Sequence, residues 1–390
     1  MIIKFKSSIQ READRFFKEL SNEDFNIRKV TKSAFTKARA KLNPWAFKRL
    51  NDVAVNTFYA KAPYRTWHNK RVLATDGTRL VLPKHPSILA EFGSNKFGPK
   101  ADSERTLALG SSLYDVLNFI ALDAEISSYD DHERDLLLKH LDKIQEGDLL
   151  LLDRGYPCFW LLFLLKAKKI DFCVRLKSKW WLKVKDFFES NESERIVSFK
   201  LPKKDYKKLD DYPEIRETEI KCRLVKVVLD TGEIEILCTS LLDSHEYKQE
   251  EFKELYHFRW NHEEGYKLLK SRVEVERFSG KTLLAIKQDF YAKFFLLTLT
   301  AAYAHPIEQK VVEEFKADEN RIHNQKINRT NSIATTQDII IGVMLKNLVV
   351  KALKAFDDIV FRTREIIRHG RSNPRKHRQK NPYTMNYKPL

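Results

Sequence analysis

The stretch Asp148-Leu-Leu-Leu-Leu-Asp153-Arg-Gly-Tyr156 decides the fold of this chain. A short, wholly apolar run that ends in a carboxylate and a glycine is typical of a strand buried on both faces of a parallel or mixed sheet. In open α/β sheets, ligands bind just beyond the carboxyl ends of such strands. Asp153 lies at that place and is a candidate site residue. The alternative interpretation is a turn aspartate that precedes Gly155.

The residues around this strand alternate between strand and helix patterns, which indicates an α/β fold with a mixed sheet. The predicted elements are two strands within 106–124 joined near residues 114–115, a helix at 133–144, the buried strand at 149–152, a helix at 159–168 and a strand at 172–176.

A second acid, Asp76, interrupts the apolar-rich stretch Arg71-Val-Leu-Ala-Thr-Asp76-Gly-Thr-Arg-Leu-Val-Leu82. Asp-Gly between hydrophobic runs is a strong hairpin signal, so a type I′ turn is one interpretation. In the other interpretation the strand continues through Asp76, and its carboxylate faces a site. The sequence leaves both open.

Four polar residues, Tyr256, Arg259, Glu263 and Lys270, occupy positions i, i+3, i+7 and i+14 of a predicted helix. At about 100° per residue they share an arc of about 60°, whereas Glu264 projects about 100° away from Glu263. The stripe borders the core, and the alternative is an exposed helix with i,i+4 ion pairs such as Arg259–Glu263. The neighbouring apolar arc holds Leu255, Phe258, Tyr266, Leu269 and Val273.

A further acidic cluster, Asp130-Asp-His-Glu133, precedes the predicted helix at 133–144. Histidine and carboxylates are metal ligands, so the cluster could be a metal site. Acids at a helix start also complement the helix dipole and supply caps. We favour the cap.

In chain order, the two aspartates followed by Tyr-x2-Arg-x3-Glu-x6-Lys resemble the DDE transposases of bacterial insertion sequences, and within them the subgroup with that signature. The resemblance runs from about Thr31 to about Ala304, and it implies an RNase H-like fold, which the order of predicted elements also suits. Similar motifs are Leu113-Tyr-Asp-Val-Leu-Asn118, Asp153-Arg-Gly-Tyr156, Arg259-Trp260, Phe278-Ser-Gly280 and Lys287-Gln-Asp-Phe-Tyr-Ala292.

The resemblance assigns roles to the site residues. It implies that Asp76, Asp153 and Glu263 form the catalytic, metal-binding triad. It also implies that Tyr256, Arg259 and Lys270 contact the DNA backbone near the cleaved end.

The chemistry supports a metal-binding set. Phosphodiester cleavage and strand transfer need an activated oxygen nucleophile and a stabilised leaving oxygen, which two Mg²⁺ ions about 3.5–4 Å apart can supply. Mg²⁺ prefers carboxylate, phosphate and water oxygens. Three converging carboxylates would repel one another without cations. We therefore expect two Mg²⁺ ions, with Mn²⁺ as a substitute.

Charge and composition favour a nucleic-acid partner. The 390 residues include 71 Lys and Arg against 54 Asp and Glu, a formal net charge of +17. Such an excess favours a polyanion through counterion release. The longest apolar stretches are too short to span a bilayer, and the amino terminus lacks a signal peptide pattern, so we expect no membrane and a cytoplasmic location. The four cysteines show no metal-ligand spacing and are expected to be buried thiols.

Two basic segments are further candidates for DNA contact. Residues 31–42 form a predicted helix with a plausible N-cap at Thr31, although a solvated surface would give the same pattern. The tail at 371–380 is expected to add affinity through phosphates without sequence choice. The cations concerned are Lys32, Lys37, Arg39 and Lys41 in the first segment, and Arg371, Arg375 and Lys376 in the second.

Five segments are predicted. They are a helical DNA-binding domain at 1–66, the first part of the RNase H-like catalytic core at 67–178, a β-rich insertion at 179–247, the second part of the core with the Glu263 helix at 248–320, and a C-terminal helical region with a basic tail at 321–390.

The predicted function is that of an insertion-sequence DNA transposase. Its partners are double-stranded DNA, namely inverted-repeat ends and target DNA, and a second copy in a synaptic dimer. Two alternatives stay open: a metal-dependent nuclease on the same fold, which cleaves without joining, and a transposase-derived DNA-binding protein that is no longer catalytic.

Overall fold

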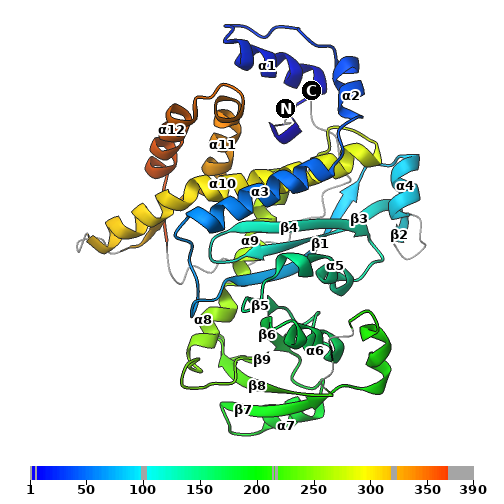
Figure 1. The fold of residues 1–390 in the computed structure, drawn as a ribbon, viewed down its shortest axis with the longest axis vertical. Helices are drawn as coiled ribbons and strands as arrows, with labels where there is room; N and C mark the ends of the chain where they lie inside the picture. Colours follow the sequence, from blue (N-terminus) through cyan, green and yellow to red (C-terminus); the bar gives the residue numbers. More distant parts are fainter. Residues whose placement is uncertain are drawn as a thin grey trace.

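A mixed β-sheet forms the centre of the protein (Figure 1). The computed structural model describes residues 2–4, 7–97, 103–212, 215, 218–317 and 323–367, and within them the sheet has nine strands. Eight follow the order β2-β3-β1-β5-β6-β9-β8-β7, and β4 pairs with β3. The strands are β1 (Val72–Leu82), β2 (Asn95–Phe97), β3 (Ser103–Asp115), β4 (Ile120–Ser128), β5 (Leu149–Leu152), β6 (Asp171–Leu176), β7 (Glu194–Lys200), β8 (Glu219–Val228) and β9 (Ile234–Thr239).

Five of these strands, in the order β4-β3-β1-β5-β6, make up the predicted core sheet. β1, β5 and β6 are parallel, and β3 is antiparallel to both β1 and β4. Helices flank this sheet on both faces (Figure 1). The prediction of an RNase H-like α/β core is confirmed.

The leucine run is the central strand β5, and all four of its residues have no exposed surface. Alternate residues of a strand point to opposite faces, and the two faces belong to two hydrophobic clusters. Leu150 and Leu152 pack with α6 (Phe159–Ala167), whereas Leu149 and Leu151 pack with α9 (Trp260–Ser271) and α10 (Leu283–Ala317). Burial on both sides explains why no polar residue interrupts the run.

The hairpin interpretation of Asp76-Gly77 is wrong. β1 continues from Val72 to Leu82 without a turn, and β3 pairs with it along ten residues, including Asp76 opposite Ser112. The long antiparallel ladder supplies hydrogen bonds on both sides of Gly77, and these outweigh the local turn preference of the dipeptide.

The helix that carries the polar stripe is divided in two. α8 (Glu251–His257) ends before Phe258, and α9 begins at Trp260. At the junction the Arg259 N–H donates to the Tyr256 carbonyl, three residues back, at 3.2 Å. The expectation of one continuous α-helix therefore needs correction, because the backbone tightens locally into the narrower i→i+3 pattern.

The segment predicted as an insertion continues the sheet. It contains α7 (Leu182–Glu189), β7, the 3₁₀-helix η3 (Lys203–Leu209), β8 and β9, and β9 pairs antiparallel with β6 at the edge of the core. Whether the five predicted segments behave as separate domains stays a prediction. Three cysteines are buried, Cys158 is half-buried and all four are free, as expected.

The described residues before β1 and after α10 are mostly helical. The predicted carboxyl-terminal helical region contains two helices among the described residues, one from Arg329 and one from Val349, and they are separated near Asn347, whose left-handed φ of 53° ends the helical path. The helices are η1 (Ile2–Lys4), α1 (Ile9–Ser21), α2 (Lys32–Arg39), α3 (Trp45–Lys61), α4 (Pro86–Phe92), α5 (Glu133–His140), η2 (Leu141–Lys143), α11 (Arg329–Met344) and α12 (Val349–Arg362), with a small ladder of β10 (Gln325–Lys326) and β11 (Glu365–Ile366).

Of the helices that the structure describes, none has the length and apolar character needed to cross a bilayer.

Candidate functional site

Asp76 lies on β1 and Asp153 directly follows the neighbouring strand β5, at the same distance along the two paired strands. β1 and β5 are paired as far as Ala74 opposite Leu151, and each aspartate follows two residues later. The Asp76 Oδ1 accepts the Gly77 N–H at 2.8 Å, and the Asp153 Oδ1 accepts the Gly155 N–H at 2.7 Å. The structure therefore brings these two predicted residues together at the carboxyl end of the buried strand, as the sequence indicated.

A third carboxylate next to them is Glu133, which the sequence interpretation assigned to a helix cap. The acids do lie at the start of α5, but the residue at the N-cap is His132 and its side chain makes no capping hydrogen bond. Instead Glu133 reaches the backbone of β1, where a Cβ on Gly77 would lie only 2.2 Å from its Oε1. The available signal was indirect: a glycine in mid-strand and an acid at the start of the next packed helix.

The three acids influence one another electrostatically. Burial raises the pKa of Asp76 to about 7, and the charge of Glu133 adds to that rise. Burial also raises the pKa of Glu133, and the Asp153 charge adds to it. Like charges in a partly desolvated site disfavour the ionised forms, so the cluster is electrostatically strained when no cation is bound.

Glu263 forms an ion pair with an arginine. Its Oε1 accepts a hydrogen bond from Arg259 Nη2 at 2.9 Å, and the Glu263 side chain is 31% exposed. The Arg259 guanidinium is buried and acts on the charge of Asp76 as well. The structure thus contains the Arg259–Glu263 ion pair of the alternative interpretation. The pair is not on an exposed helix face, because Arg259 is buried and acts on the charge of Asp76.

The other two stripe residues hydrogen-bond to strand backbone. The buried Tyr256 hydroxyl donates to the Leu152 carbonyl at 3.3 Å, directly before Asp153. Lys270 Nζ donates to the Arg79 carbonyl at 2.7 Å, and burial lowers its pKa. Both residues therefore attach the α8–α9 segment to the strands that carry the aspartates.

A buried polar network holds α9 against β1 and β3. The Tyr266 hydroxyl donates to the Asp76 carbonyl at 2.6 Å and accepts from Ser112 Oγ at 3.1 Å. Ser112 Oγ also lies 2.8 Å from His262 Nε2, and burial lowers the pKa of His262 to about 3. A neutral histidine here fits a structural role next to the strand that carries Asp76.

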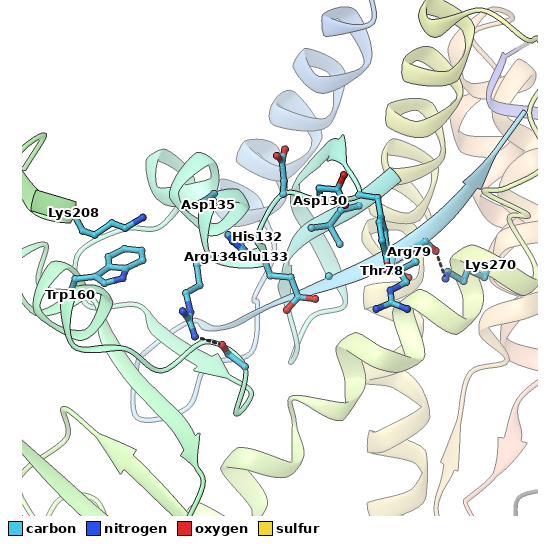
Figure 2. A pocket seen from close by; sticks show the side chains of 15 residues that line it. Thr78, Arg79, Asp130, His132, Glu133, Arg134, Asp135, Trp160, Lys208 and Lys270 are labelled. Carbon is cyan, nitrogen blue, oxygen red and sulfur yellow. Dashed lines mark hydrogen bonds between the residues drawn. The ribbon is translucent and has the colours of Figure 1, made fainter. Parts of the chain in front are cut away.

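An open cavity of about 900 Å³ lies beside the acids. In Figure 2, Glu133 and Arg134 extend into it from the start of α5, Arg79 and Lys270 lie on one side, and Trp160 and Lys208 lie on the other. The lining combines four cations and the rings of Tyr129 and Trp160 with four carboxylates, and the cations and rings suit a phosphate-bearing ligand.

The predicted DNA-binding cations on α2 and in the turn after it differ in their placement. Lys32, Lys37 and Lys41 are exposed. Arg39 is buried, and its guanidinium forms an ion pair with Asp289 at 2.8 Å and contacts Gln288. The expectation of a DNA contact by Arg39 needs correction, because these partners already occupy its donors. Arg371, Arg375 and Lys376 lie outside the described residues.

The predicted metal-binding triad is not assembled as a ligand set. Within the residues that the structure describes, no three or more His, Cys, Asp or Glu side chains lie in a position to hold one metal ion. Asp76 and Asp153 are adjacent, whereas Glu263 is held by Arg259. A cation that used all three acids would require side-chain rotation at Glu263.

Comparisons with known proteins identify relatives of this chain. Residues 67–299 match the family described as transposase DDE domain, a range that contains Asp76, Glu133, Asp153 and Glu263. The transposase InsG of insertion sequence element IS4 from Escherichia coli (strain K12) is 25% identical over 256 residues, which cover 64% of this chain and 55% of that protein. The match thus spans about half the length of the relative. The solved synaptic complex of piggyBac transposase with hairpin DNA is similar with a TM-score of 0.39 and 9% identity, over 74% of this chain and 53% of that one.

Proposed function

Since this chain belongs to the transposase DDE domain family, we propose that it is an insertion-sequence transposase that binds terminal inverted repeats and catalyses metal-dependent DNA cleavage and strand transfer. The observation that carries the proposal is the position of Asp76 and Asp153 at neighbouring strand ends, beside a cavity whose lining includes both cations and carboxylates. The net charge of +17 supports a DNA partner.

The donor set fits divalent cations. Asp76, Asp153 and Glu263 offer the hard carboxylate oxygens that Mg²⁺ and Mn²⁺ accept. The raised pKa of Asp76 reflects burial and a like charge, which bound cations would offset. Two bound ions would activate the attacking oxygen and stabilise the leaving oxygen. Glu263 would become free to bind a cation if Arg259 gave its hydrogen bond to a DNA phosphate instead.

The remaining site residues bind and orient DNA in this proposal. Arg259 grips a phosphate through its planar guanidinium, and Lys270 at the cavity wall acts as a point charge. Tyr256 donates its hydroxyl to a phosphate oxygen once it leaves the Leu152 carbonyl. Contacts to the DNA backbone come from Lys32 and Lys37 on α2, from Lys41 just after it, and from the tail residues Arg371, Arg375 and Lys376. A second copy pairs the two element ends.

The test uses linear duplex DNA that carries the element's own ends, with Mg²⁺ or Mn²⁺. We expect cleavage at the ends, followed by joining to a target. Asp153→Ala and Glu263→Gln should each abolish both cleavage and joining. Glu264→Gln should leave both steps intact. Glu264 is a matched control because it is adjacent and exposed, and pairs with Lys267.

The outcomes separate the candidate functions. Cleavage without joining supports a nuclease, and binding of the ends with neither step supports a non-catalytic DNA-binding protein. If Asp153→Ala retains both cleavage and joining, the site assignment is wrong.

A further inference from the structure

Arg39 attaches α2 to the catalytic core. The helix lies next to the beginning of α10 (Figure 1), and within this fully described helix Arg39 is the only buried residue. Phe35 is half-buried against a small apolar cluster that includes Phe47, whereas Lys32 and Lys37 are exposed. The attachment is therefore largely polar and depends on the guanidinium of Arg39.

Two motifs of the sequence, at 278–280 and 287–292, supply most partners of Arg39, and neither motif has a role in the proposed function so far. The guanidinium forms the ion pair with Asp289 at 2.8 Å and donates to three further acceptors. These acceptors are Gln288 Oε1, the Ser279 hydroxyl and the Ala285 carbonyl. Because the donors of a guanidinium form a rigid fork, four acceptors fix its orientation as well as its position.

Gln288 also holds the end of α2 through its backbone. Its Nε2 donates to the carbonyl of Arg39 at 3.1 Å and to the carbonyl of Leu42. Carbonyls at the end of a helix have no partner within the helix. The last turn of α2 is thus bound to α10 through both a side chain and the main chain.

The segment that contains Ser279 is joined in turn to the elements that carry the acids. Residues 272–282 connect α9 to α10, and Glu276 Oε1 in this connection accepts the N–H of Val81 on β1 at 2.9 Å. Lys293 on α10 donates to three carbonyls of the connection. They are those of Glu274, Val275 and Arg277, at 2.8, 3.3 and 3.0 Å. Arg39 therefore binds α2 to a segment that is itself fixed to α9, α10 and β1.

We propose that Arg39 is a positioning residue, which sets the end-binding helix α2 at a fixed place relative to the acids and so determines which phosphodiester of a bound end reaches them. The inference rests on the proposed function, in which Lys32 and Lys37 contact DNA. It goes beyond that function by assigning the coupling between end binding and cleavage to one buried ion-pair network. Because Arg39 is buried, its loss should change the placement of the DNA and not the affinity for it.

The test separates binding from cleavage on linear duplex DNA that carries the element's ends. Arg39→Gln should bind the ends within about twofold of the wild type. Its single-turnover cleavage rate at saturating protein should fall about tenfold or more, because a displacement of about 1 Å at a reacting centre can cost about 10²-fold. The cuts should also spread to neighbouring phosphodiesters. Lys37→Gln should show a different pattern, with weaker binding through the loss of a phosphate contact and an unchanged position of the cut.

Two further variants control for folding and for charge. Arg39→Lys keeps a cation opposite Asp289 but cannot reach all four acceptors with one ammonium group, so it should fold and still spread the cuts. Arg49→Gln is the matched control, because Arg49 is exposed on α3 and should behave like the wild type. If Arg39→Gln loses binding and cleavage to the same extent while Arg39→Lys behaves like the wild type, Arg39 only stabilises the fold and the positioning role is wrong.

Hydroxyl-radical footprints of the bound ends, taken without divalent cations, distinguish failure of this inference from failure of the proposed function. If the wild type protects its ends without cutting them, and Arg39→Gln shortens the protected region on the side of the cleavage site, the proposed function fails and the positioning role stands. If the wild type cuts its ends, and Arg39→Gln cuts at the same position and rate, the positioning role fails and the proposed function stands. If the wild type does not bind the ends, both fail.

Discussion

The strand-borne acids and the helix-borne acid of the site are held in different ways. Asp76 and Asp153 are set by the pairing of β1 with β5, and each accepts a hydrogen bond from nearby backbone. Glu263 lies on α9 and is held by a side chain, the guanidinium of Arg259. Backbone pairing fixes position before any ligand binds, whereas a side-chain ion pair can be exchanged. We therefore distinguish a preformed part of the site, Asp76 and Asp153, from an adjustable part, Glu263 with Arg259.

The largest expected effect tests the preformed part. Asp76→Asn removes a charge and a ligand at once, so end cleavage with Mg²⁺ should fall by about 10³-fold, equivalent to about 4 kcal/mol of transition-state stabilisation. A single-turnover cleavage assay measures it, with Asp135→Asn as the control because Asp135 is an exposed acid that lines the adjoining cavity. If the cleavage rate fell by less than about tenfold, Asp76 would not be a residue of the reacting centre.

The next effect concerns the ion pair of the adjustable part. Arg259→Gln leaves Glu263 without its partner and removes a buried cation near Asp76, so the free energy of unfolding should fall by about 3 kcal/mol. Urea denaturation of the metal-free protein measures it. Arg272→Gln is the control, because Arg272 is exposed at the end of the same helix. Equal stability of the two variants would show that the ion pair contributes nothing.

The same contrast explains what the sequence could predict. β5 was predictable because four consecutive leucines, bounded by aspartates and followed by a glycine, are too few for a helix and favour a short strand covered on both faces; Asp153 followed from the place where that strand ends. Glu263 could be chosen over Glu264 because helical spacing separates the two. In both cases the information is local, within one strand or one helix.

Contacts between distant segments were not predictable in this way. Asp76-Gly77 has the local preference of a turn, and only the ladder with β3 and the contact with Glu133 explain its place in a strand. Arg39 looks like a surface cation by its neighbours in sequence. Its burial depends on Asp289, 250 residues away along the chain. Such pairings are decided by tertiary packing, which overrides local pattern.

The third prediction concerns the repulsion between the acids of the preformed part in the metal-free protein, which makes the folding stability depend on pH. The pKa of Asp76 rises from its usual 3.8 to about 7 on folding, so the native state retains a proton that the unfolded state has released. Stability should therefore fall as pH rises from about 4 to about 7. The full pKa shift corresponds to a stability loss of about 4 kcal/mol. Because the side chains of the acids can rotate apart, we expect a loss of about 2 kcal/mol.

Asp76→Asn isolates this contribution, because asparagine keeps the acceptor for the Gly77 N–H without the charge. Denaturation in urea should show the variant about 2 kcal/mol more stable than the wild type at pH 8, and no more stable at pH 4. Excess Mg²⁺ should narrow the gap at pH 8 by stabilising only the wild type. A gap independent of pH would show that the charge of Asp76 is not its cause.

The smallest effect tests the junction between the two parts. Tyr266→Phe removes the hydrogen bond from α9 to the Asp76 carbonyl, which should cost about 1 kcal/mol of folding stability. Tyr206→Phe is the control, because Tyr206 is 44% exposed. If the hydroxyl keeps the helix-borne acid in register with β1, cleavage should slow while Mn²⁺ binding by the strand-borne acids stays unchanged. Equal losses of cleavage and Mn²⁺ binding would mean that the helix and the strands form one rigid unit, and the division into a preformed and an adjustable part would fail.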